Sequence, residues 1–224
     1  MRQISAAIFD FDETIINLEP QHTAAHEALC RAMGNDYQQM PSSYREVSGR
    51  RIIDDIRGMR AFFHWKTSEE ELMAIRRPMF DDVCRTADLQ LMPGAERTIR
   101  TLHEMKIPMA IATSAVGPSV DILLRRFGLR DAFRLIVDGS EVAIGKPDPQ
   151  AYVLTAERLG ADPHDCVVFE DSHVGVVAAK RAGAYCVAVR NPDAKMRQDL
   201  SEADVVLDSF EQLDVRSAFA LKER

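Results

Sequence analysis

A chain of 224 residues can bury a sizeable hydrophobic core, and it fits one domain or one domain with an insertion. Its net charge of −7 argues against a general binder of nucleic acid or of anionic membranes, although a metal ion and one lysine can still create a local site for an anion. No apolar run approaches the roughly 20 residues of a membrane-spanning helix, and the N-terminus is not typical of a signal peptide.

The cysteine pattern contains no metal or redox motif. The four cysteines form no CxxC pair and have no zinc-like spacing with the histidines. Cys166 and Cys186 lie within apolar runs, where a cysteine is usually a small buried hydrophobe. We therefore expect reduced thiols and a cytoplasmic protein.

The first predicted element is a strand over residues 4–9, which ends in Asp10-Phe11-Asp12-Glu13-Thr14. Successive strand residues point to opposite faces, so Asp10 and Asp12 point the same way. Two adjacent carboxylates resist joint ionisation, and such a pair is typical of a cation site, a shared proton or divided chemical roles. The alternative is a helix-capping aspartate beside a solvated one, and the spacing alone does not decide between the two.

Residues 17–88 carry helical patterns and no convincing strand. Three apolar stripes have helical spacing: Ala25, Leu29, Ala32 and Met33; Ile52, Ile53 and Ile56; Leu72, Ile75, Met79 and Val83. They predict a small all-α domain inserted directly after the first strand. Pro93 and Gly94 mark the turn by which the chain returns. Because the insert leaves and re-enters at one edge, it is placed to hinge as a lid.

From residue 89 onward, strand and helix patterns alternate. Apolar runs over residues 107–112, 135–137, 166–169, 185–189 and 204–207 are separated by segments with helical spacing. This order predicts an α/β fold with a Rossmann-like, mostly parallel sheet flanked by helices. We expect a core formed by residues 1–16 and 89–224 and a helical cap formed by residues 17–88. Such sheets bind ligands beyond the carboxyl ends of their strands.

Polar residues follow several of these strands. They are the aspartate pair, then Thr113 and Ser114 before Gly117-Pro118, Lys146 before Pro147, and Glu170-Asp171-Ser172. Four carboxylates at one edge require a divalent cation, and oxygen ligands suit Mg²⁺. An ammonium, a hydroxyl and free N–H groups at a helix start suit a phosphate. Together they indicate phosphoryl transfer with an aspartate as covalent nucleophile.

Each of these motifs also has a structural interpretation when it is taken singly. Thr113 and Ser114 are suitable helix caps, Lys146 is a plausible solvated turn lysine, and Glu170-Asp171-Ser172 can cap the helix that follows. The coincidence of all of them at strand ends favours the catalytic interpretation.

On these motifs the sequence resembles the haloacid dehalogenase superfamily, in the β-phosphoglucomutase-like branch with a helical C1 cap. The family motifs appear in order and span essentially the whole chain: Asp10-Phe11-Asp12-Glu13-Thr14, Thr113, Lys146-Pro147 and Glu170-Asp171-Ser172. The Lys-Pro peptide bond is often cis in relatives. Glu13 departs from the pattern, because many relatives carry glycine there, and it could alter the loop that leads to the cap.

The resemblance implies roles for the acidic residues. Asp10 would attack phosphorus, and Asp12 would protonate the leaving alcohol and then deprotonate the hydrolytic water. Mg²⁺ would be held by the Asp10 carboxylate, the Asp12 backbone carbonyl, and Asp171 with Glu170 directly or through water.

The resemblance also implies a phosphate site. Thr113 and the N–H groups of Ser114 and Ala115 would hold the transferring oxygens. Lys146 would bridge the phosphate and the Asp10 carboxylate, and as a charge partner it would lower the basicity of that carboxylate.

Substrate selection is expected of the cap, because the core residues reach only phosphate and metal. The candidate contacts are Glu19, His22, Arg50, Arg51 and Arg76. The alternative for the arginines is a position on solvated helix faces. His22 and His26 lie one turn apart, but a metal pair there is disfavoured. We expect Trp65 and Phe62-Phe63 in the cap core.

The implied function is a Mg²⁺-dependent phosphatase that hydrolyses a small phosphorylated metabolite, a sugar phosphate, through an aspartyl phosphate. The alternatives are a sugar-phosphate mutase and a non-enzymatic binding protein with a relict pocket. In the mutases an arginine follows the cap-loop glycine by three positions, where this chain has Ile52, and a cap lysine aligns with Arg76. Both differences favour a phosphatase, while Asp12 argues against dehalogenases and phosphonate hydrolases. We expect a monomer or weak homo-oligomer, with no nucleic-acid or membrane partner.

Overall fold

In the computed structural model of the chain, residues 1–45, 51–115, 119–191 and 198–222 are described. Within them, six parallel strands form a central sheet in the order β4-β3-β2-β5-β6-β7. The strands are β2 (Ala6–Phe9), β3 (Met109–Ala112), β4 (Leu135–Val137), β5 (Cys166–Glu170), β6 (Tyr185–Val189) and β7 (Val205–Leu207). The predicted α/β fold with a parallel, Rossmann-like sheet is confirmed.

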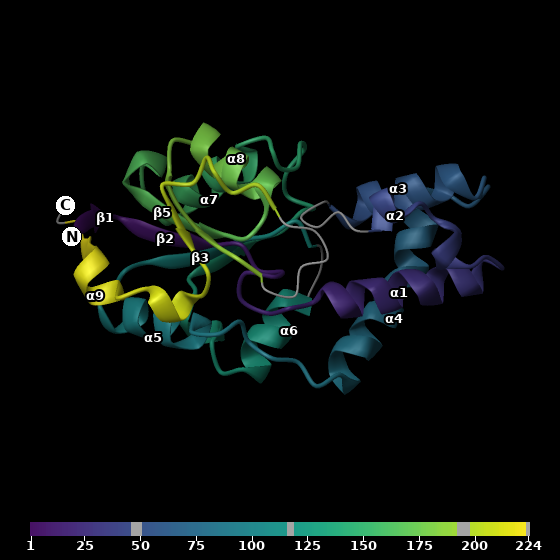
Figure 1. Cartoon of the computed structure of the whole chain (residues 1–224), viewed down its shortest axis with the longest axis horizontal. Coiled ribbons are helices and arrows are strands. Elements are labelled where there is room, and N and C mark those ends of the chain that lie inside the picture. Colours follow the sequence, from purple (N-terminus) through teal and green to yellow (C-terminus); the bar gives the residue numbers. More distant parts are fainter. Residues whose placement is uncertain (46–50, 116–118, 192–197, 223–224) are drawn as a thin grey trace.

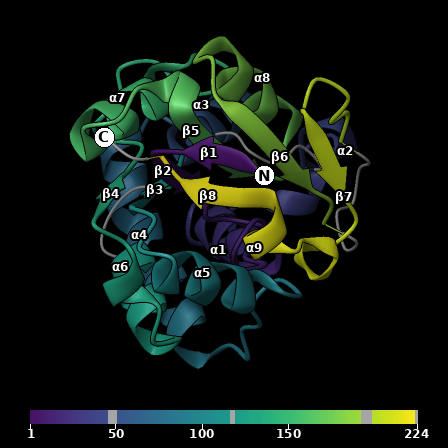
Figure 2. The same cartoon turned by 90° about the vertical axis from the view of Figure 1, so that its left-hand side faces the viewer.

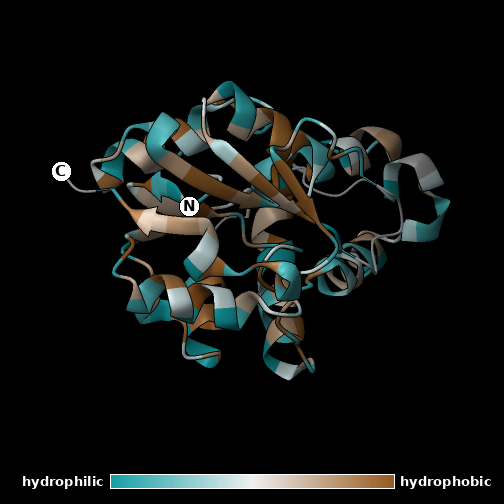
Figure 3. Ribbon diagram, turned by 60° about the vertical axis from the view of Figure 1, so that its left-hand side comes forward, coloured by the Kyte–Doolittle hydropathy of each residue, from teal (hydrophilic) through white to brown (hydrophobic). Residues whose placement is uncertain are grey.

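Helices cover both faces of this sheet (Figures 1 and 2). They are α5 (Ala95–Glu104) and α6 (Ser119–Arg126) on one face, and α7 (Gln150–Leu159) and α8 (His173–Arg181) on the other. Alternate residues of β2 divide between them: Ala7 and Phe9 pack in the apolar cluster that contains α5 and α6, and Ala6 and Ile8 in the one that contains α7 and α8. The central strands are therefore apolar throughout, while polar residues lie on the outer faces of the helices (Figure 3).

The predicted strand over residues 4–9 is wrong at its start. It is broken at Ser5 into β1 (Arg2–Ile4) and β2, which belong to different sheets. β1 pairs in parallel with β8 (Phe219–Leu221), which follows the short helix α9 (Val215–Ala218). The Ser5 N–H donates to the carbonyl of Asp165, and the Lys222 N–H donates to that of Ile4. The two halves separate because β1 pairs with the distant β8, whereas β2 pairs with β3 and β5 of the central sheet.

The cap helices are α1 (Glu19–Ala32), α2 (Ser42–Arg45), α3 (Ile52–Phe62) and α4 (Glu69–Thr86). They lie together at the end of the molecule opposite the two termini (Figure 1). Many buried residues of the cap form an apolar cluster of their own, which includes Leu29, Ile56 and Met59 on the helices and Trp65 between α3 and α4. Among the described residues from 17 to 88 no strand is present, as expected. The domain boundaries at 16/17 and 88/89 stay a prediction.

The cysteines and the length and composition of the helices bear on two expectations from the sequence. All four cysteines are buried as free thiols; burial was expected of Cys166 and Cys186. In the described part of the chain, no helix combines the length and the apolar composition that crossing a bilayer requires.

Candidate active site

The site begins where β2 ends. β2 is an inner strand of the sheet, between β3 and β5. Its last residue, Phe9, pairs with Ile111 of β3 and Phe169 of β5, and its ring stacks on that of Phe169 with centroids 4.5 Å apart. The Asp10 N–H then donates to the carbonyl of Phe169 at 3.0 Å. This packing fixes Asp10 at the carboxyl edge of the sheet, where its side chain is buried.

Lys146 lies between two buried carboxylates. Its Nζ is 2.5 Å from Asp10 Oδ1 and 2.6 Å from Glu170 Oε1. Lys146 belongs to the loop between β4 and α7. The Lys146–Pro147 peptide bond is cis. Burial opposes the charge of Lys146, but the Asp10 and Glu170 carboxylates outweigh it and raise the pKa of the ammonium above its usual range. Lys146 is therefore a permanent cation in this site.

One lysine does not balance the acidic groups around it. Asp10, Glu170 and Asp171 each offer a carboxylate oxygen within 4.8 Å of the others, and all three residues are buried. Burial, reinforced by the charge of Glu170, raises the pKa of Asp10 to about 8 even against Lys146, and the same causes raise the pKa of Asp171 well above its usual value. The pKa of Glu170 is lowered, because Lys146 and its hydrogen bonds outweigh its burial. Such an excess of buried negative charge and oxygen donors fits a divalent cation.

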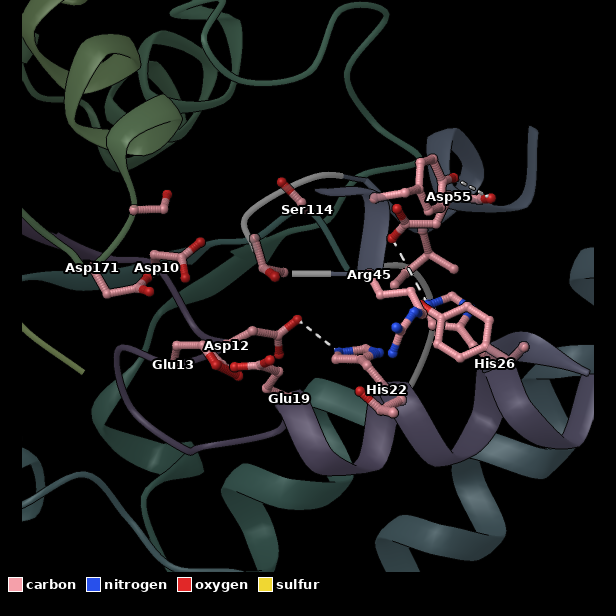
Figure 4. A pocket seen from close by; sticks show the side chains of 16 residues that line it. Asp10, Asp12, Glu13, Glu19, His22, His26, Arg45, Asp55, Ser114 and Asp171 are labelled. Atoms are coloured by element: carbon pink, nitrogen blue, oxygen red, sulfur yellow. Dashed lines mark hydrogen bonds and ion pairs between the residues drawn. The ribbon is translucent and has the colours of Figure 1, made fainter. Parts of the chain in front are cut away.

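Asp12 makes a different set of contacts from Asp10. Its Oδ2 lies 3.1 Å from Nε2 of His22 on α1 (Figure 4). Nδ1 of the same ring lies 3.0 Å from Nη2 of Arg76, and since a guanidinium only donates, this nitrogen accepts. The proton of His22 is thus on Nε2 and is donated to Asp12. Within the described residues, the other oxygen of Asp12, Oδ1, is buried and has no hydrogen-bond partner.

The residues expected to bind the phosphate come directly after β3. Thr113 is buried, its N–H donates to the carbonyl of Val137, and Ser114 lines the pocket beside it. The N–H of Ala115, which was expected to hold a phosphate oxygen, donates to Oγ1 of Thr113 at 3.0 Å. The predicted Gly117-Pro118 helix start lies outside the described residues.

The pocket lies between this sheet edge and the cap. The core contributes Asp10, Asp12, Glu13, Thr113, Ser114, Asp171 and Ser172. The cap contributes Glu19, His22, Thr23, His26, Tyr37, Tyr44, Arg45, Ile52 and Asp55. In Figure 4 the two aspartates Asp10 and Asp171 lie together on one side, and His22, His26 and Arg45 face them from the other. A ligand in this pocket would therefore touch core and cap at once.

The structure separates the five cap candidates. Glu19 and His22 line the pocket, and Arg50 lies outside the described residues. Arg51 pairs with Asp54 at 2.9 Å and also donates to the carbonyl of Ala143. Arg76 is buried behind His22, so the alternative of a solvated helix face is wrong for this arginine.

Three more residues contact the site, and of these only Tyr152 was not named from the sequence. Thr14 donates from Oγ1 to Asp171 Oδ1 at 3.2 Å, and it belongs to the first motif, so that motif was the signal for it. Glu13, at a φ of 62°, is buried and accepts the Leu18 N–H at 3.0 Å. Tyr152 donates its hydroxyl proton to Glu170. No local pattern marks Tyr152, because an aromatic residue on a helix facing a sheet is ordinarily part of the core.

Known proteins match this chain over nearly its whole length. The family model of haloacid dehalogenase-like hydrolases matches residues 4–183. A Drosophila melanogaster protein named "Probable pseudouridine-5'-phosphatase" is 36% identical over 220 residues, which cover 94% of this chain and 91% of that one. Hexitol phosphatase A of Escherichia coli is 31% identical over 208 residues, covering 93% and 92%.

A solved structure shows the same architecture. The crystal structure of CbbY from Rhodobacter sphaeroides in complex with phosphate superposes with a TM-score of 0.84 at 27% identity, covering 95% of this chain and 97% of that one. Fold, motif order and sequence agree, and the chain belongs to the haloacid dehalogenase-like hydrolases. The resemblance seen in the sequence is confirmed.

Proposed function

We propose that this hydrolase is a Mg²⁺-dependent phosphatase that acts on a small phosphorylated metabolite, a sugar phosphate, through an aspartyl-phosphate intermediate. The observation that carries the proposal is the unlike surroundings of the two aspartates. Asp10 is held by Lys146 among buried carboxylates, whereas Asp12 is hydrogen-bonded to His22 and its other oxygen is buried with no hydrogen-bond partner among the described residues. One aspartate is thus suited to attack and the other to proton transfer.

The donor set of the site fits a hard divalent cation. We assign the carboxylates of Asp10 and Asp171, the backbone carbonyl of Asp12 and the carboxylate of Glu170 to its surroundings. When bound, the cation would offset the repulsion between an anionic nucleophile and an anionic phosphate.

In the proposed reaction, a carboxylate oxygen of Asp10 attacks phosphorus, and the bond from phosphorus to the ester oxygen breaks. Asp12 gives its proton to the leaving alcohol. Asp12 then takes a proton from a water molecule, whose oxygen attacks the same phosphorus and breaks its bond to Asp10. Lys146 keeps Asp10 oriented, and Thr113 with Ser114 binds the transferring oxygens.

The cap would choose the alcohol. Among the candidate contacts we retain Glu19 and His22, which line the pocket, and add Arg45 of α2. Two relatives are named as phosphatases of a hexitol and of pseudouridine 5'-phosphate, which supports a phosphorylated polyhydroxy compound as substrate. A cytoplasmic location and a monomer or weak homo-oligomer stay predictions.

The mutase alternative is disfavoured by the cap. The position that carries an arginine in the mutases is Ile52 here, and this apolar side chain lines the pocket. An apolar residue offers nothing to hold the second phosphate that a mutase must bind. Interconversion of hexose 1- and 6-phosphates without net phosphate release would favour the mutase instead.

A phosphate-release screen over sugar, polyol and nucleoside monophosphates, with Mg²⁺ present, tests the proposal. Hydrolysis should vanish with EDTA, return with Mg²⁺, and fall by orders of magnitude in Asp10→Asn, which removes the nucleophile. Asp208→Asn, an exposed aspartate away from the pocket, is the matched control and should keep full activity. Near-full turnover in Asp10→Asn would refute the assignment of the nucleophile.

A further inference from the structure

Both carboxylate oxygens of Glu170 are surrounded by hydrogen-bond donors from the protein. Oε1 accepts from Nζ of Lys146 and from the hydroxyl of Tyr152. Oε2 accepts from the N–H of Asp171 and from both the N–H and the hydroxyl of Ser172, at 3.0 to 3.1 Å. A carboxylate presents about four lone-pair positions, so protein donors occupy all of them. Asp10 and Asp171 line the pocket, whereas Glu170 does not.

Tyr152 completes this arrangement from the far side of the site. It lies on α7, its side chain is 1% exposed, and it packs in the apolar cluster that contains Ile8 and Val168. Nζ of Lys146 lies 4.9 Å from the centre of its ring. The hydroxyl and the ring of one side chain therefore contact both members of the Lys146–Glu170 pair.

We propose that Tyr152 is a positioning residue: by occupying Oε1 of Glu170 it fixes the Lys146–Glu170 pair and keeps Glu170 from ligating the metal, which is then held by Asp10, Asp171 and the Asp12 carbonyl. Glu170 contributes negative charge and the orientation of Lys146, and through Lys146 the orientation of Asp10. This inference rests on the proposed metal-dependent reaction, and it narrows the role of Glu170 within it.

The chemistry of the pair supports this division. A tyrosine hydroxyl bonded to a carboxylate is a charge-assisted hydrogen bond, which is stronger and more directional than a neutral one. Lys146 has a flexible stem, and its ammonium would otherwise rotate between the carbonyl of Ala112, at 3.4 Å, and its two carboxylates. When Tyr152 holds Glu170 in place, the Lys146 ammonium has one defined orientation toward Asp10.

The test is Tyr152→Phe, which removes the hydroxyl and keeps the ring. Mn²⁺, which takes the same oxygen ligands as Mg²⁺, is titrated into metal-free protein without substrate and followed by calorimetry and by the EPR signal of free Mn²⁺. We expect the Mn²⁺ affinity of Tyr152→Phe to equal or exceed that of the wild type, because no ligand is lost and a lone pair of Glu170 is released. Asp171→Asn should weaken Mn²⁺ binding at least about tenfold, because it removes a ligand.

The kinetic expectation is a split between the two steady-state constants. In Tyr152→Phe, kcat should fall about tenfold while KM changes little, since Lys146 loses its alignment on Asp10 but the pocket is intact. Tyr185→Phe on β6, whose ring contacts Arg2, is the matched control and should change neither constant nor Mn²⁺ affinity. Thermal unfolding confirms that each variant is folded.

Two results would overturn the inference: a kcat of Tyr152→Phe within twofold of the wild type, or a loss of Mn²⁺ affinity as large as that of Asp171→Asn. Absence of any phosphatase activity in the wild-type protein would instead count against the proposed function. The substrate-free Mn²⁺ comparison would then still decide whether Glu170 ligates the metal.

Discussion

Glu13 is buried where the charged form of its carboxyl group is poorly stabilised. Its side chain is 6% exposed, and burial, together with the nearby charge of Asp12, raises its pKa from 4.5 to about 8. It nevertheless has a structural task. Leu18 is the N-cap residue of α1 and its side chain cannot cap the helix, and Glu13 Oε1 accepts the backbone N–H of Leu18 and so holds the chain at the helix entry. Glu13→Gln keeps this acceptor and removes the charge.

The effect on stability depends on pH in a defined direction. When the pKa of a carboxyl is higher in the folded than in the unfolded protein, its contribution to stability is complete below the unfolded value of 4.5 and is lost as the pH rises toward 8. At about 1.4 kcal/mol per pKa unit, the whole window amounts to roughly 4 to 5 kcal/mol. Between about pH 5.5 and about pH 7.5, the wild type should lose roughly 2 to 3 kcal/mol of stability relative to Glu13→Gln.

The difference in unfolding free energy between the wild type and Glu13→Gln is measured by urea unfolding at these two pH values, on metal-free protein with EDTA present. EDTA is needed because a bound cation would stabilise the ionised carboxyl groups nearby. Glu157→Gln, an exposed glutamate on α7, is the control, and it should leave the pH dependence of the wild type unchanged. If the free-energy difference between the wild type and Glu13→Gln is the same at both pH values, Glu13 does not titrate in this window and the reasoning from its burial is refuted.

Two further predictions follow from contacts in the site and in the core. His22→Ala should lower kcat about tenfold to a hundredfold in steady-state assays, because Asp12 loses a charge-assisted hydrogen bond. The control His103→Ala, at an exposed histidine, should leave kcat unchanged. Equal kcat values in the two variants would contradict a role for His22. Burial raises the pKa of all four cysteine thiols, to about 12 for Cys30, Cys84 and Cys166 and further for Cys186. Native protein should therefore resist a thiol reagent at about pH 8, and all four thiols should react on unfolding. Fast labelling of the native protein would contradict this.

Much of the fold could be predicted from the sequence because it rests on local patterns. Strands buried on both faces are apolar throughout, and the strands of a parallel sheet end at one edge, so the apolar runs and the polar residues after them indicated both the sheet and its functional edge. Asp10, Lys146, Glu170 and Asp171 do meet at that edge. Their proposed chemical roles stay predictions that the assays above test.

The errors and omissions have a common physical origin in contacts between distant segments. Nothing in residues 4–9 indicates a break at Ser5, because the break depends on pairing of β1 with a strand more than two hundred residues away. Arg76 lies four residues from both Leu72 and Phe80, on the buried face of α4. Its charge allowed a solvated position, yet it is buried against His22 and His26 on α1. A side chain's neighbours across the fold are not encoded in the period of its own helix.

The sequence by itself determined the class of fold, the edge of the sheet at which the polar residues gather, and the types of group gathered there, because these follow from periodicity and from residues at strand ends. Only the tertiary structure decided how those groups differ. It set Lys146 between Asp10 and Glu170, fixed the proton of His22 toward Asp12, and brought the Tyr152 hydroxyl to Glu170. Hydrogen-bond partners and burial control ionisation, and both are properties of the packed chain.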